Sequence, residues 1–238
     1  PLKDAAQRIA WGNSLNAGQT CIAPDYVLVP EDRVGAFIDA YRQVMHSFYP
    51  TLSDNPDYTA IINERQLARL EHLKTDASAK GARLIPLYEQ GQGRRMPHCL
   101  LLEVNDEMQV MQEEIFGPLL PIVPYRHLEQ ALAYINDRPR PLALYYFGYN
   151  KAEQQRVLEN THSGGVCVNE TLLHVAIDDL PFGGVGPSGM GCYHGHEGFL
   201  TFSHAKAVLT KQRVNSSLAI YPPYGRTLGR RVQKLFPR

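Results

Sequence analysis

Helical segments alternate with short apolar segments along most of this chain, and the alternation limits the possible folds more than any other feature. Apolar residues at helical spacing predict helices, and short β-rich runs between turn signals predict strands. The expected helices are Leu2–Leu15, Glu31–Ser47, Glu64–Ala79, Leu128–Asn136 and Lys151–Thr161. The expected strands are Tyr26–Val29, Arg83–Tyr88, Cys99–Val104, Leu119–Tyr125, Ala143–Tyr149 and Gly165–Asn169. Because apolar strands are separated by helices, we predict an α/β fold: a largely parallel sheet flanked by helices.

Composition narrows the choice of partners. With 238 residues and 44% hydrophobic composition, the chain can bury a substantial core. Lys+Arg and Asp+Glu balance at 24 each, so no overall charge favours a nucleic acid or an anionic membrane as a partner. No apolar run approaches the ~20 residues of a membrane span. We therefore expect neither nucleic acid nor membrane as a partner.

The cysteine pattern bears on metals and on the compartment. The four cysteines are Cys21, Cys99, Cys167 and Cys192, and no pair has the C-x-x-C spacing of a zinc site or a redox dithiol. No metal site is therefore predicted. Four thiols without a signal peptide fit a reducing compartment, so a cytoplasmic location is expected.

Cys21 stands in a stretch built for a tight connection. Gly18 lets the backbone turn without a Cβ penalty, and Pro24 fixes the exit. A thiol at such a turn can be approached by backbone N–H groups, which makes Cys21 a candidate nucleophile. The alternative is inert packing, because free cysteines are among the most buried residue types.

Three ordered stretches carry a resemblance to a known family. They are Asn16–Tyr26 around Cys21, Gln112–Pro118 with the sequence QEEIFGP, and the glycine-rich stretch from Pro181 that continues to His204. The first is similar to the nucleophile segment of the aldehyde dehydrogenases, and APDY at its end resembles the class 3 branch. The second resembles the cofactor-contact motif, and the third the class 3 signature. Within that branch, the resemblance is strongest to enzymes that oxidise coniferyl aldehyde.

The resemblance implies roles for individual residues. It makes Cys21 the nucleophile, lets Glu114 hydrogen-bond the nicotinamide ribose and packs Phe116 near the nicotinamide ring. It also implies that Phe182 is a wall of the aldehyde pocket and that Asn169 lies nearby. An exposed acidic turn is the plainer interpretation of Glu114, and satisfying strand-end backbone is the plainer role for Asn169. The implied cofactor is NAD or NADP, the substrate a small-molecule aldehyde (possibly aromatic, coniferyl-type), and the assembly a homodimer.

The same resemblance indicates that this chain corresponds to the C-terminal, catalytic half of such an enzyme. The N-terminal Rossmann domain that binds most of the cofactor, the glutamate base and the asparagine oxyanion donor would then precede Pro1, and we expect the isolated chain to be inactive. Residues 1–205 are expected to form the catalytic domain. Residues 206–238 would be a basic C-terminal strand and tail that contacts the missing part or a partner subunit. The basic residues after Glu197 are Lys206, Lys211, Arg213, Arg226, Arg230, Arg231, Lys234 and Arg238.

Two alternatives remain open. Cys21 could serve a thiol hydrolase with one of the histidines His162, His174, His194, His196 or His204. The chain could also be a folded fragment without any chemistry. A third pattern is rejected: Gly184-x-Gly186-x-x-Gly189 matches the dinucleotide fingerprint, but Pro187 lies inside it and no acidic residue follows Glu197. We expect an irregular loop there.

Overall fold

A computed structural model describes residues 2–52, 54–211, 213–214, 217, 221–223, 227, 231 and 234. The chain divides into two compact units, Pro1–Phe202 and Ser203–Arg238. The helices and strands that surround the candidate site belong to the first unit.

A four-stranded sheet forms the centre of the first unit. Its order is β1 (Val27–Pro30), β4 (Leu119–Tyr125), β3 (Cys99–Leu102) and β2 (Arg83–Pro86). The β1–β4 and β4–β3 pairs are parallel, and only the β3–β2 pair is antiparallel. The sheet is therefore largely parallel, as the alternation of helices and strands predicts.

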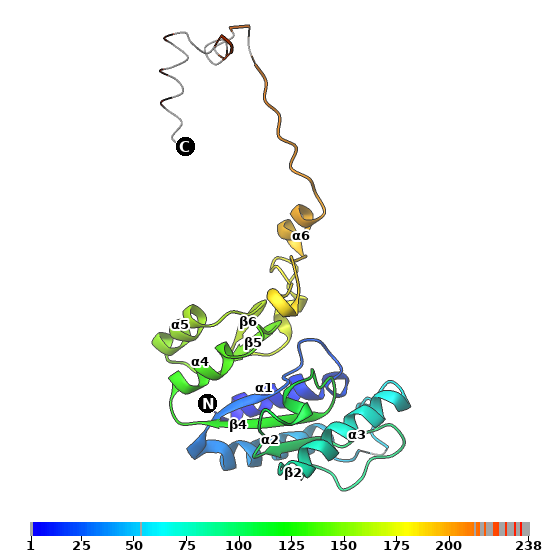
Figure 1. Ribbon diagram of the computed structural model, residues 1–238. Helices are drawn as coiled ribbons and strands as arrows, with labels where there is room; N and C mark the ends of the chain where they lie inside the picture. The colour runs from blue at the N-terminus through cyan, green and yellow to red at the C-terminus, as the bar shows by residue number, and fades with distance from the viewer. Residues whose placement is uncertain are drawn as a thin grey trace. The chain divides into compact units, whose positions relative to one another are not determined.

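Helices cover both faces of this sheet (Figure 1). Helices α1 (Leu2–Ser14) and α2 (Val34–Phe48) pack on one face, against a cluster that includes Leu100, Leu102, Leu120 and Ile122. Helix α3 (Glu64–Ala79) packs on the other, against Cys99, Leu101 and Leu119. Successive residues of β3 and β4 point to opposite faces, so each strand serves both clusters. Fully burying each such leucine contributes about 1.5–3 kcal/mol.

A second, two-stranded sheet consists of β5 (Ala143–Tyr146) and β6 (Gly165–Val168), which run parallel. Helices α4 (Leu128–Asn136) and α5 (Lys151–Asn160) lie beside it (Figure 1). Their apolar side chains close a small core with the strands, formed by Leu132, Leu144 and Val157. The Asn150 side chain caps the start of α5 by accepting bonds from the N–H groups of Ala152 and Glu153.

The predicted fold class is confirmed, with two differences. The strands form two sheets, because within the described residues β1 pairs only with β4 and β5 only with β6. A cavity lined by both β1 and β5 lies where those edges are free. The short helix α6 (Gly195–Thr201) was not expected, since Gly195 and Gly198 weaken helix propensity.

The structure describes only parts of the C-terminal unit. Residues 203–211 form neither helix nor strand, while Arg226, Arg230 and Arg238 lie outside the described residues. The expected boundary at residue 205 and the role of the basic tail stay predictions. Across the described part of the chain, the helices are all too short or too polar to cross a lipid bilayer.

Candidate active site

Cys21 lies in a tight loop directly after α1. The chain leaves the helix through a 3-10 turn, Leu15–Gly18, in which Asn16, Ala17 and Gly18 have positive φ angles of 53°, 53° and 73°. The N–H of Ala23 then donates to the carbonyl of Thr20 (3.1 Å), which closes a turn with Cys21 near its tip. The Cys21 side chain is exposed. The expected tight connection is therefore present, and it presents the thiol outward.

The loop is fixed on both sides of the cysteine. Buried Asn13 donates from Nδ2 to the carbonyl of Pro24 (2.9 Å) and accepts from the Tyr41 hydroxyl (3.1 Å). Gln19 donates to the carbonyl of Ala60 (3.2 Å) and accepts from the N–H of Ile62 (2.9 Å). These bonds hold the thiol on a rigid support, which is what a positioned nucleophile needs.

The Glu114 motif forms a second turn beside this loop. Ile115 is 1% exposed and anchors the turn, while Glu114 is exposed and Phe116 is 41% exposed. Phe116 has a φ of +51°, a left-handed conformation that is uncommon for an aromatic residue. The backbone thus turns two side chains outward around one buried anchor. Such strained positions cluster at functional sites.

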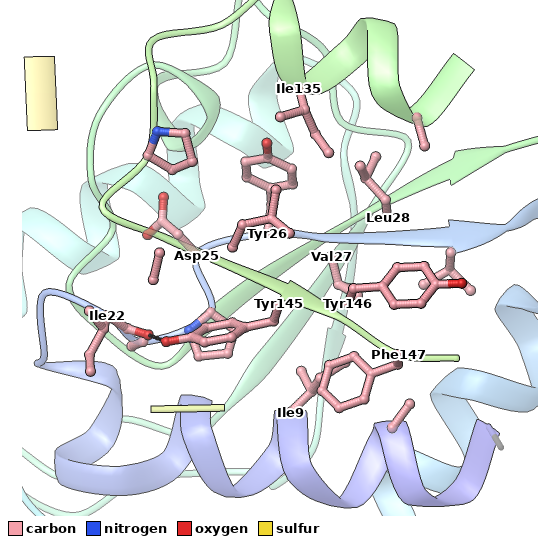
Figure 2. A pocket seen from close by; sticks show the side chains of 18 of the residues that line it. Ile9, Ile22, Asp25, Tyr26, Val27, Leu28, Ile135, Tyr145, Tyr146 and Phe147 are labelled. Carbon is pink, nitrogen blue, oxygen red and sulfur yellow. Dashed lines mark hydrogen bonds between the residues drawn. The ribbon is translucent and has the colours of Figure 1, made fainter. Parts of the chain in front are cut away.

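Cys21, Glu114 and Phe116 line one cavity of about 660 Å³. Figure 2 shows its floor and walls, with Ile9 of α1, Val27 and Leu28 of β1, and Tyr145 to Phe147 from the end of β5 around it. The Tyr145 hydroxyl donates to the carbonyl of Ile22 (2.7 Å), which ties β5 to the cysteine loop. The candidate nucleophile and the two candidate cofactor contacts are thus brought together, three of the five residues that the sequence analysis names.

Asp25 also lines this cavity, four residues after the cysteine. Burial raises the pKa of its carboxyl to about 7, and the neighbouring Glu114 carboxylate acts in the same direction. The N–H of Ile115 and the guanidinium of Arg69 oppose the rise without cancelling it. This carboxyl therefore changes its charge near neutral pH.

The two weaker pocket candidates lie elsewhere. Phe182 does not line the cavity; it is 9% exposed and packs with Ile22 and Leu172 in a separate apolar cluster. Asn169 accepts from the N–H of Gly148 (2.8 Å) and donates to its carbonyl (3.0 Å), which is the plainer, strand-end role. Phe182 thus lies behind residues that line the cavity, since Ile22, Leu142 and Ala143 belong to or pack against its cluster.

A cysteine–histidine pair exists, but it does not involve Cys21. The Sγ of Cys167 lies 3.1 Å from Nδ1 of His174. Burial raises the pKa of the Cys167 thiol and lowers that of His174, so the pair is neutral near pH 7. Among the described residues, no hydrogen bond joins Cys21 to a histidine. The hydrolase alternative thus finds no dyad around the exposed thiol.

The glycine-rich stretch is an irregular loop, as expected. Gly186–Ser188 forms a single 3-10 turn between segments without regular structure. A Cβ on Gly184 would lie 2.1 Å from the carbonyl oxygen of Ser188, so the glycine permits close backbone packing there. This is no dinucleotide-binding turn. The described part of the chain also holds no cluster of metal-ligating side chains.

Sequence reasoning missed three residues of the site. Asp25 belongs to the stretch that carried the resemblance, but no spacing rule marks it as part of a site. Arg69 lies on α3 and donates to the carbonyls of Glu114 (3.3 Å) and Ile115. Tyr145 reads as an ordinary aromatic strand residue. Arg69 and Tyr145 act across 45 or more positions of sequence, and no local pattern reveals such contacts.

The profile of the aldehyde dehydrogenase family matches residues 1–208. The chain belongs to the aldehyde dehydrogenase family. The resemblance of the three motifs is therefore confirmed over most of the sequence.

Curated relatives agree with this assignment. A probable coniferyl aldehyde dehydrogenase of Pseudomonas aeruginosa is 69% identical over 238 residues, a match covering 100% of this chain and 50% of that protein. The coniferyl aldehyde dehydrogenase of a Pseudomonas species is 49% identical over 234 residues, covering 95% of this chain and 49% of that protein. The chain spans about half the length of the curated relatives it matches.

Solved structures share the fold. The substrate-bound state of Staphylococcus aureus AldH is 38% identical with a TM-score of 0.83, covering 99% of this chain and 51% of that one. An NADP-dependent glyceraldehyde-3-phosphate dehydrogenase from Bacillus halodurans, complexed with NADP, is 27% identical with a TM-score of 0.73. That match covers 81% of this chain and 40% of the other.

Proposed function

We propose that this chain supplies the nucleophile and part of the cofactor contact of an NAD(P)-dependent aldehyde dehydrogenase. The observation that carries the proposal is the shared cavity, which an exposed thiol, an exposed carboxylate and a half-exposed aromatic ring all line. Family membership supports it independently.

Cys21 is the residue that attacks the aldehyde. Its Sγ adds to the carbonyl carbon to give a thiohemiacetal, which loses a hydride and a proton to become a thioester. Water then cleaves the thioester, releasing the carboxylic acid and restoring the thiol. The rigid loop serves this step because it holds the sulfur in one place while the carbonyl approaches.

Glu114 and Phe116 suit the nicotinamide end of a dinucleotide. A carboxylate that faces the cavity can accept hydrogen bonds from two ribose hydroxyls, and an aromatic face can shield the reacting ring from water. When bound, the cofactor supplies the hydride acceptor. Nicotinamide cofactors fit the family, and one structural neighbour is described as complexed with NADP. The proposal leaves NAD and NADP as alternatives.

For the substrate we propose an aromatic aldehyde of the coniferyl type. The relatives with the highest identity given above are named for coniferyl aldehyde. The walls are also suited to a ring, since Tyr145 lines the cavity and Ile22 packs against buried Phe182 and half-buried Trp11. An aliphatic aldehyde would make weaker contacts with these walls.

The test is a chimera in which residues 1–238 replace the matching segment of the Pseudomonas aeruginosa relative. With NAD or NADP and coniferyl aldehyde, we expect multiple turnovers. They are measured through the absorbance of the reduced cofactor. Hexanal serves as the aliphatic comparison. Cys21→Ala should abolish turnover, whereas Cys192→Ala, at a half-buried thiol outside the cavity, should leave it unchanged. Full activity of the Cys21→Ala chimera would refute the proposal.

A further inference from the structure

Asp25 joins the two turns that carry the candidate chemistry. Its Oδ1 accepts a hydrogen bond from the N–H of Ile115 at 2.9 Å, across 90 positions of sequence. Asp25 lies four residues after Cys21, and Ile115 lies between Glu114 and Phe116. One carboxyl group therefore connects the nucleophile loop directly to the turn that presents both cofactor-contact side chains.

Arg69 holds the same turn from the other side. Its guanidinium donates to the carbonyl of Glu114 at 3.3 Å and to that of Ile115. The turn thus gives its N–H to a carboxylate and two of its carbonyls to a cation. Charge-assisted hydrogen bonds of this kind are about twice as strong as neutral ones. With Ile115 buried between them, the turn has little freedom to shift.

We propose that Asp25 is a positioning residue, which fixes the Glu114–Phe116 turn against the Cys21 loop and so sets the spacing between nucleophile and cofactor contacts. The inference rests on the proposed function for what the spacing achieves. It goes further in assigning a residue that acts by holding the Glu114–Phe116 turn in place. The charged groups that face Asp25 are Glu114 and Arg69, with the Tyr26 hydroxyl nearby.

The charge of Asp25 matters to this role. An ionised carboxylate accepts the Ile115 bond strongly, whereas a protonated carboxyl is a weaker acceptor. Because burial raises the pKa of Asp25 to about 7, the bond strengthens as the pH rises through 7. The Michaelis constant for the cofactor should accordingly rise as the pH falls from 8 to 6. An asparagine at this position offers a neutral acceptor at every pH.

The first experiment uses the 238-residue chain itself and reads the tether directly. Asp25→Ala should speed hydrogen exchange at the Ile115 amide by about tenfold or more, while the rate of iodoacetamide labelling at Cys21 stays within about twofold. Asp76→Ala is the matched control, because Asp76 of α3 also accepts a backbone N–H from far along the chain, that of Gln109 at 2.8 Å, and does not line the cavity. It should speed exchange at Gln109 and leave Ile115 unchanged. Unchanged exchange at Ile115 in folded Asp25→Ala protein would overturn the tether.

The second experiment uses the chimera described above. Asp25→Ala should raise the Michaelis constant for the cofactor by about tenfold and change that for the aldehyde much less. Asp25→Asn should restore most of the affinity but lose the pH dependence between 6 and 8. A loss of folding alone would lower the amount of active enzyme but leave both Michaelis constants unchanged. Thermal melting checks for such a loss. An unaltered cofactor constant in Asp25→Ala would overturn the positioning role. If the parent chimera itself failed to turn over, the proposed function would fall, while the exchange experiment would still decide the tether.

Discussion

Gly18 and Gly117 meet so closely that a Cβ added to Gly18 would lie 2.4 Å from the carbonyl oxygen of Gly117. The first glycine precedes Cys21 by three residues, and the second directly follows Phe116. The two turns of the candidate site therefore touch backbone to backbone. Any side chain at Gly18 would force them apart.

Gly18→Ala should consequently destabilise the site. Its φ of +73° already costs a non-glycine residue about 1–2 kcal/mol, and the clash adds to that cost. We expect a loss of at least about 2 kcal/mol in the free energy of unfolding, measured by urea denaturation. Gly35→Ala is the control, because an added Cβ there meets nothing within 4 Å and alanine favours the helix. Equal stability of the two variants would contradict this account of the contact.

Cys21 should be the first thiol to react. Cys99 and Cys167 are buried, and burial raises the pKa of Cys99 to about 11 and raises that of Cys167, so thiolate is scarce at both. With limiting iodoacetamide at pH 7.5, mass spectrometry of the folded chain should find Cys21 modified well before either of them. Urea-unfolded chain is the control and should lose the preference. Earlier labelling of Cys99 or Cys167 in folded protein would count against Cys21 as the exposed nucleophile.

Glu114→Gln should weaken cofactor use in the chimera. A lost pair of charge-assisted hydrogen bonds suggests an effect of about 1.5–3 kcal/mol on cofactor binding or on hydride transfer. Labelling of Cys21 should remain unaffected, because Glu114 faces the cavity without supporting the cysteine loop. Glu113→Gln, at the exposed neighbouring residue, is the matched control. If the kinetic constants for both cofactor and aldehyde stayed the same, Glu114 would not have its proposed role.

Much of the fold follows from local sequence patterns. Alternation in β3 and β4 places Leu100 and Leu101 on opposite faces, and helical spacing in α2 buries Phe37, Tyr41 and Met45. These patterns are local because one element's spacing decides which side chains can be buried. For the same reason, helix boundaries were predicted to within about one residue in α1, α3 and α4.

The division into two sheets could not be predicted in this way. Whether β5 joins β1 depends on which segments compete for the free edge, and the composition of β5 says nothing about that competition. The Asp25–Ile115 and Arg69–Glu114 hydrogen bonds could not be predicted from the sequence for a related reason. Each joins a side chain to backbone far along the chain, and any residue could have provided that N–H or carbonyl.

His98 should make the fold sensitive to acid. It is 0% exposed, with its ring nitrogens 2.9 Å from the Tyr58 hydroxyl and 3.3 Å from the carbonyl oxygen of Asn13. Burial lowers its pKa from 6.5 to about 4, so between these values the unfolded chain binds a proton that the folded chain does not. The contribution of His98 to stability is constant above about pH 6.5 and falls by roughly 3 kcal/mol as the pH drops to 4. Asp25, whose pKa burial raises to about 7, contributes in the opposite direction over the same window.

The measurement is urea denaturation at a series of pH values from 8 to 4. Relative to the parent chain, His98→Gln should gain roughly 3 kcal/mol of stability between pH 6.5 and 4, because glutamine takes up no proton. His127→Gln changes an exposed histidine and should keep the slope of the parent chain. If the free energy of unfolding changed with pH equally in His98→Gln and in the parent chain, His98 would not contribute to the acid response.

The isolated 238-residue chain should not turn over aldehyde. In the proposed function Glu114 and Phe116 contact only one end of a dinucleotide, so these contacts alone would hold the hydride acceptor loosely and the proximity advantage would be lost. Losing an oxyanion donor typically costs about 10²–10³ in rate, and losing a general base a further 10²–10⁴. Among the described residues, no histidine or carboxylate is hydrogen-bonded to Cys21 to act as that base.

Cys21 should still accept an acyl group from an activated ester, but the acyl-enzyme should persist for hours on mass spectrometry. Repeated reduction of NAD or NADP by the isolated chain with coniferyl aldehyde would show that the machinery for hydride transfer and deacylation lies within these residues.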